Sequence, residues 1–132
     1  MKFQITLVRL GAVGFDLFGL AYFFMPQQMS GLLGIQLTQP SAFGDVRAVY
    51  GGLAFGVAVF LWLCGNPIHA RMGAKLLLLM GIGLVSGRIL SIVINGAPNA
   101  AALVLLSIEV SMTLVSIFAL RTPAETTQLQ TA

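Results

Sequence analysis

The sequence predicts an all-α fold, a single membrane domain of residues 1–132 built as a bundle of four transmembrane helices. Of its 132 residues, 58% are hydrophobic and 8% are charged, whereas an average soluble domain is about 45–50% apolar and about 25% charged. Seven Lys and Arg and four Asp and Glu are too few to cover the surface of a soluble globule. The composition therefore excludes a soluble enzyme, a nucleic-acid-binding module and a disordered chain.

Long apolar stretches are the second observation behind this fold class. Each is close to the ~20 residues that a helix needs to cross the hydrocarbon core. A membrane barrel is disfavoured because the stretches lack alternation and are about twice the length of a barrel strand. The predicted helices cover about residues 4–25, 45–64, 71–94 and 99–120, and they end at the breakers Pro26, 65–67, 95–98 and Pro123.

The first stretch could also be a signal peptide. Lys2 precedes it, and residues 19–21 loosely fit a small-x-small cleavage site. Arg9 and Asp16 interrupt the stretch, however, whereas the core of a signal peptide is normally uncharged. We therefore expect residues 4–25 to be retained as a helix.

The basic residues predict the orientation. With four helices, Lys2, Arg71, Lys75 and Arg121 fall on one side of the membrane, whereas the connection 26–44 on the other side contains no Lys or Arg. The positive-inside rule then places both termini in the cytoplasm, and we expect a multi-pass protein of the bacterial inner membrane.

The two longest polar segments lie outside the predicted helices. The connection 26–44 mixes apolar residues with Gln and Gly, so we expect it in the outer interface, either as an amphipathic loop or as a short helix over the mouth of the bundle. The polar tail 122–132 is expected to be poorly ordered.

Charged residues inside the predicted helices are the candidate site. A charge in hydrocarbon is costly unless it has a partner or a polar cavity. A rise of ~1.5 Å per residue places the deepest of them about 9–15 Å inside the outer ends of their helices. A guanidinium can bind a carboxylate through two hydrogen bonds, so the preferred pairs are Arg88 with Glu109 and Arg47 with Asp16. The predicted polar layer comprises Asp16, Asp45, Arg47, Tyr50, Arg88, Asn95 and Glu109.

Three roles are open for this layer. It can be a buried ion-pair network that fixes the register of the helices and binds nothing. It can be a pocket for the polar head of a lipid, a quinone or a similar small amphiphile. A proton relay through the same acids is the third.

Two pairs of glycines follow the GxxxG spacing of membrane helix packing. They are Gly52 with Gly56 and Gly83 with Gly87. Small residues one turn apart allow two backbones to approach closely. We expect these glycines to pack inside the bundle rather than to form a dimer seam.

Several kinds of chemistry lack the residues they need. His69, the one histidine, has no Cys or His partner nearby in the sequence, so a metal or haem site has no ligand set. Cys64 lies at the end of an apolar run with no general base beside it. No glycine-rich phosphate loop is present. We therefore expect no catalytic residues, no metal ligands and no cofactor apart from a bound lipid or quinone, and the sequence favours a protein that is not an enzyme.

Residues 44–53, with the sequence GDVRAVYGGL, resemble the D/E-x-R-A-x-Y-G-G signature of a bacterial membrane family, domain of unknown function 4345. Further similarities follow in order at Pro26, residues 87–91, residues 95–98 and Glu109. The family often has an Asp where this chain has Asn95. The resemblance implies a small four-helix membrane protein without an assigned activity. A fainter likeness to DoxX-type four-helix proteins, some of them linked to quinone redox systems, is an analogy of architecture.

Two hypotheses for the function follow. The first is an accessory or binding subunit of a larger membrane assembly, because the chain has no nucleophile, metal set or soluble domain. The second is a lipid- or quinone-binding protein, with a redox or transport role as an option, in which Arg47, Arg88 and Glu109 surround the head of the ligand.

Overall fold

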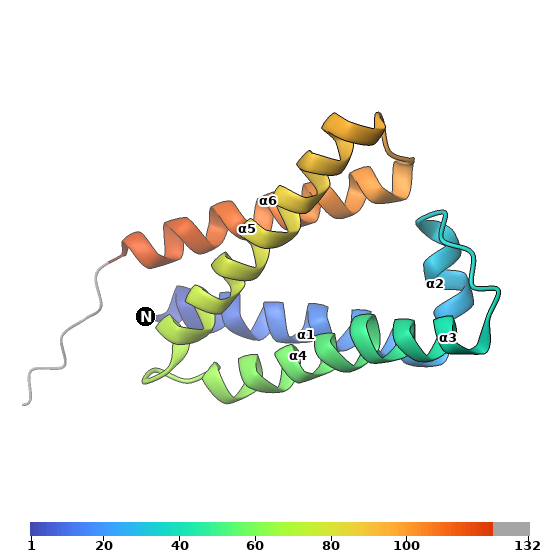
Figure 1. Ribbon diagram of the computed structural model, residues 1–132. Coiled ribbons are helices and arrows are strands. Elements are labelled where there is room, and N and C mark those ends of the chain that lie inside the picture. Colours follow the sequence, from blue (N-terminus) through green and yellow to red (C-terminus); the bar gives the residue numbers. More distant parts are fainter. Residues whose placement is uncertain (123–132) are drawn as a thin grey trace, which may run out of the picture.

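The computed structural model describes residues 1–122, and these residues form helices and short connections (Figure 1). Four segments are long and apolar enough to cross a membrane. They are α1 (Lys2–Phe24), the segment Pro40–Cys64, α5 (Ala70–Asn95) and α6 (Ala100–Arg121). The predicted all-α fold with four membrane-spanning helices is confirmed.

The second spanning segment begins earlier than predicted and contains an irregular stretch. It starts at Pro40 instead of residue 45, since proline fits the first turn of a helix. The segment is continuous through α3 (Pro40–Val46), the π-helical turns of η1 (Arg47–Gly52) and α4 (Leu53–Cys64). Such π-helical turns frequently mark functional sites.

The connection between the first two spanning helices is partly helical. Its first part is α2 (Pro26–Leu32), which leaves only residues 33–39 without helical structure. A turn at Gly34, with φ of +77°, reverses the chain because glycine adopts this conformation without strain. In Figure 1, α2 lies across one end of the bundle, which we call the α2 end. The opposite end, with the N-terminus and the turn between α4 and α5, is the terminal end.

The helices associate as two antiparallel pairs, α1 with α4 and α5 with α6 (Figure 1). A core at the terminal end joins α5 to the first pair, with Val8 and Ala12 of α1, Leu61 of α4 and Leu77 of α5 fully buried. A smaller core around Tyr22, at the α2 end, packs α1 against the 33–46 region.

Helix α5 leaves the bundle halfway along its length. Its buried residues are Ala70, Gly73, Ala74, Leu77 and Gly81, and none follows Gly81. The second half therefore diverges from α1 and α4, as Figure 1 shows, and its neighbour within the described chain is α6.

Close helix packing uses other glycines than those predicted. A Cβ on Gly19 would lie 3.0 Å from the carbonyl oxygen of Gly51, so α1 and η1 approach backbone to backbone. A Cβ on Gly56, Gly83 or Gly87 would meet nothing within 4 Å. The expectation that these three pack inside the bundle is wrong, because GxxxG spacing fixes a shared face of one helix but not the direction in which that face points. A Cβ on Gly52 would lie 3.9 Å from the ring of Phe23, which is an ordinary van der Waals distance, so Gly52 is not needed for a close approach of the two helices.

Candidate functional site

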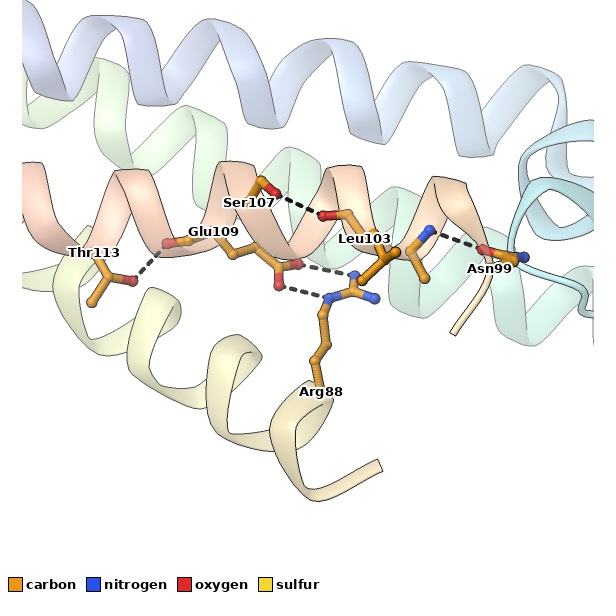
Figure 2. Close-up of polar contacts among 7 residues, drawn as sticks. Arg88, Asn99, Leu103, Ser107, Glu109 and Thr113 are labelled. Atoms are coloured by element: carbon orange, nitrogen blue, oxygen red, sulfur yellow. Dashed lines mark hydrogen bonds and ion pairs between the residues drawn. The ribbon is translucent and has the colours of Figure 1, made fainter. Parts of the chain in front are cut away.

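Arg88 on α5 and Glu109 on α6 form an ion pair, joined by two hydrogen bonds. Nε of Arg88 donates to Oε2 of Glu109 at 2.6 Å, and Nη2 donates to Oε1 at 2.9 Å. The two side chains are 27% and 11% exposed. Figure 2 shows the two parallel bonds, which use both carboxylate oxygens. The predicted pairing of Arg88 with Glu109 is confirmed.

The packing of α5 against α6 positions this pair. Thr113, one turn after Glu109, donates its hydroxyl to the Glu109 carbonyl oxygen at 2.7 Å (Figure 2). The side chain of Thr113 also fills the space in front of Gly81, where a Cβ would collide with it. The two helices thus touch at Gly81, and the long Arg88 side chain bridges the wider gap about two turns further along α5.

A pocket of about 220 Å³ lies beside the ion pair at the α2 end. Arg88, Ser91 and Asn99 supply its polar groups, and Leu33 and Ala102 are among its apolar lining residues. It is therefore bounded by α5, by α6 and by the chain just after α2. Arg88 is one of the residues that line the pocket, so the pocket adjoins the ion pair of the predicted polar layer.

Asn99 joins α2 to α6 at this pocket. Its side-chain oxygen accepts a hydrogen bond from the backbone N–H of Ala102 at 2.9 Å and so caps α6 (Figure 2). Its amide nitrogen donates to the carbonyl oxygen of Leu32, the last residue of α2, at 3.0 Å. Asn99 is not among the predicted site residues, although an Asn directly before an apolar run is a recognisable N-cap signal.

Arg47 and Tyr50 form a second polar centre, between α1 and η1. Nε of Arg47 donates to the carbonyl oxygen of Phe23 at 3.1 Å. Phe23 is in the last turn of α1, where carbonyl groups have no partner within the helix and a nearby cation is favourable. The ring of Tyr50 stacks on the buried ring of Tyr22, with centroids 5.1 Å apart. This centre holds the second spanning segment against the end of α1.

Asp16 lies elsewhere and does not bind Arg47, so the predicted Arg47–Asp16 pair is wrong. Its Oδ2 accepts a hydrogen bond of 2.6 Å from Nε1 of Trp62 on α4. The reason is register. Arg47 lies opposite Phe23, which is seven residues, or about 10.5 Å, further along α1 than Asp16.

The other two predicted layer residues also lie apart from the ion pair. Asp45 is exposed and makes no ion pair within residues 1–122. Asn95, in the last turn of α5, is exposed, and its amide donates to Ser91 at 3.4 Å. The seven residues of the predicted polar layer therefore do not gather at one place; the ionic contact that forms among the described residues is Arg88–Glu109.

Arg9 is a further polar residue whose role the sequence did not indicate. Its Nε donates to the carbonyl oxygen of Gly65, the residue that caps the end of α4, at 3.0 Å. Arg9 and Arg47 therefore have matching roles, since each lies near one end of the α1–α4 pair and binds the C-terminal carbonyls of the other helix.

Comparison with known proteins adds one match. A family model described as domain of unknown function (DUF4345) matches residues 3–120. No curated protein and no solved structure shows significant similarity to the chain.

Proposed function

The chain belongs to the DUF4345 family. We propose that it is a membrane protein that binds the polar head of an amphiphile, either a lipid or a quinone, at Arg88. Its four apolar helices support the membrane location. The observation that carries the proposal is the pocket at the α2 end, in which a guanidinium that is only partly used lines the wall.

The chemistry of Arg88 suits such a ligand. Nε and Nη2 bind Glu109, whereas Nη1 has no hydrogen-bond partner within residues 1–122. A guanidinium presents several N–H donors in a fixed plane, so one edge can bind the carboxylate while another binds a phosphate or a carbonyl oxygen. Glu109 offsets the charge of Arg88 when the pocket is empty, which lowers the cost of a cation at this depth.

The walls of the pocket fit the two parts of an amphiphile. Ser91 and Asn99 add polar groups beside Arg88, and Leu33, Ala102 and Leu106 supply apolar surface. Few polar groups on an apolar wall are typical of small-molecule sites. We propose that the head of the ligand enters below α2 and that its tail extends into the bilayer between α5 and α6.

Native mass spectrometry of the purified protein tests this proposal. We expect the wild-type protein to retain a lipid or a quinone. Ala102→Leu should remove it by filling the pocket without touching the Arg88–Glu109 pair. Ala100→Leu, an exposed position on the same helix that does not line the pocket, is the matched control and should retain the ligand. A wild-type protein without an amphiphile, or equal retention by both variants, would overturn the proposal.

We also propose that both termini face the cytoplasm of a bacterium, so that the pocket opens on the outer side of the inner membrane. The excess of Lys and Arg near the terminal end supports this orientation. A periplasmic reporter inserted near Gln36, in the 33–39 connection, should be active. Activity of a cytoplasmic reporter at that position would reverse the orientation.

A second candidate function, an accessory subunit of a larger membrane assembly, is favoured by the outer half of α5. Gly83 and Gly87 lie one turn apart where α5 has left the bundle, with open space in front of both. Glycines in this spacing allow a neighbouring membrane helix to approach closely. They are therefore available to another protein instead of to this bundle.

Purification in a mild detergent tests this second function. A partner in fixed stoichiometry should accompany the wild-type protein and be lost with Gly87→Leu. Gly14→Leu, at an open position on α1, is the control and should keep the partner. Recovery of the chain alone from native membranes would count against an accessory role.

A further inference from the structure

A second cavity, separate from the Arg88 pocket, lies between α4 and α5. It is an open groove of about 450 Å³, bounded by Gly56, Val57 and Phe60 on α4 and by Met72, Lys75 and Leu79 on α5. None of its lining residues takes part in the Arg88–Glu109 pair or in the Arg47 centre. The groove exists because α4 packs closely on α1 and only loosely on α5.

Gly56 deepens the groove on the α4 side. A Cβ at this position would meet nothing within 4 Å, so the missing side chain is not replaced by an atom of another helix. Between Met72 and Leu79 the groove follows α5 for seven residues, or about 10 Å. The groove is open to the outside and mostly apolar, so a hydrocarbon chain can lie along it.

Lys75 is the one charged residue among those that line the groove. Its side chain is exposed and makes no ion pair with the described residues 1–122. Lys75 lies five residues after the start of α5 at Ala70, about 7.5 Å along the helix axis, so its flexible stem can bring the ammonium to the membrane interface. Arg71 lies one turn earlier on the same helix and adds positive charge at that end.

From these observations we infer that the groove is a binding site for one membrane phospholipid with an anionic headgroup. The phosphate and the net negative head lie against Lys75 at the terminal end, and one acyl chain lies along Gly56 and Val57 toward Leu79. Basic residues at the edge of a cleft between membrane helices attract anionic headgroups, and no acidic side chain lines this groove to oppose them. An apolar groove with a cation at one end thus matches both halves of such a lipid.

Native mass spectrometry can test this inference with the full-length protein reconstituted into nanodiscs. Two lipid compositions are compared, phosphatidylcholine alone and phosphatidylcholine with phosphatidylglycerol. We expect one phosphatidylglycerol to be retained preferentially after release from the disc. Since a Lys near a charged surface contributes on the order of 1 kcal/mol, Lys75→Gln should weaken this retention about fivefold. Lys2→Gln, which removes a charge at the same end but outside the groove, is the matched control.

The acyl-chain part of the site has its own variant. Gly56→Leu should fold, because nothing lies within 4 Å of the new Cβ, and should reduce retention of phosphatidylglycerol to that of phosphatidylcholine by filling the groove. Gly14→Leu makes the same change at an open position on α1 and should retain the lipid. Thermal melts confirm that all four variants fold.

Four results would overturn the inference. Equal retention of the two lipids by the wild-type protein would remove the role of the headgroup charge. Unchanged retention in both Lys75→Gln and Gly56→Leu would place the lipid elsewhere. A dimer that is lost with Gly56→Leu would assign the groove to a helix of a second copy. Ala102→Leu, which fills the separate Arg88 pocket, distinguishes the two sites. Retention of phosphatidylglycerol that is lost with Gly56→Leu but kept with Ala102→Leu supports the groove, whereas retention lost only with Ala102→Leu assigns the lipid to the Arg88 pocket and overturns the inference.

Discussion

The α1–α4 and α5–α6 pairs are both antiparallel, yet different forces hold them. In the α1–α4 pair, Arg9 and Arg47 bind carbonyl oxygens at opposite ends, and the backbones touch at Gly19 and Gly51. In the α5–α6 pair, α5 contributes no fully buried residue beyond Gly81, and the Arg88–Glu109 ion pair joins the two helices there, with Val85 and Ile92 of α5 only half-buried.

This difference shows that an arginine in a membrane helix can be stabilised in two ways. Arg9 and Arg47 neutralise the partial negative charge of a helix C-terminus, and their loss leaves neutral carbonyls behind. Arg88 binds a full negative charge, so the loss of either partner leaves an uncompensated charge in the membrane. A single substitution should therefore reduce the free energy of unfolding more in the α5–α6 pair than in the α1–α4 pair. Three substitutions test this, and they are given from the largest expected loss to the smallest.

The largest effect is expected at Glu109. Glu109→Gln should lower the free energy of unfolding by about 3–5 kcal/mol, toward the lower end because Arg88 is 27% exposed. Equilibrium unfolding in mixed micelles measures this loss. Leu10→Gln, on the lipid-facing side of α1 at 66% exposure, is the comparison and should cost less. Equal losses for the two variants would mean that breaking the ion pair costs no more than placing a polar side chain against lipid.

The backbone contact of the α1–α4 pair should rank second. Gly19→Ala places a Cβ about 3.0 Å from the Gly51 carbonyl oxygen and 3.1 Å from the Phe55 nitrogen. Neither backbone atom can turn away, so we expect a loss of about 1–3 kcal/mol, as for other overpacked sites. Gly14→Ala, with nothing within 4 Å, should not destabilise. An unchanged free energy of unfolding for Gly19→Ala would show that α1 and η1 can move apart slightly without loss of stability.

The smallest effect is expected at Arg47. Arg47→Gln removes a cation from the end of α1 and should cost about 1 kcal/mol, measured by the same unfolding assay. A double-mutant cycle with Asp16→Asn checks the partner, because residues that do not touch should give additive losses. A coupling energy well above about 0.5 kcal/mol would show that Arg47 and Asp16 interact after all.

The family signature illustrates how far a motif predicts a site. Residues 44–53 include two charged residues, an aromatic residue and three glycines, and together they suggested part of a polar layer. In the fold, Arg47 caps α1, Tyr50 stacks on Tyr22, and Gly51 permits the close approach to Gly19. These contacts join the second spanning segment to α1. The pocket forms instead at Arg88 and Asn99, on the other pair of helices.

The sequence by itself determined the number and class of the helices, because apolar runs of about 20 residues bounded by Pro and Gly have one stable solution in a bilayer. It also predicted the pairing of Arg88 with Glu109, because a charge inside the membrane needs a partner, but the same reasoning failed for Arg47 and Asp16, which bind other groups. Only the tertiary structure decided which carbonyl Arg47 binds, which glycines pack, and where α5 leaves the bundle. The physical reason is that periodicity defines the faces of each helix separately. The rotation and the axial shift of one helix against another depend on the packing of all of them together.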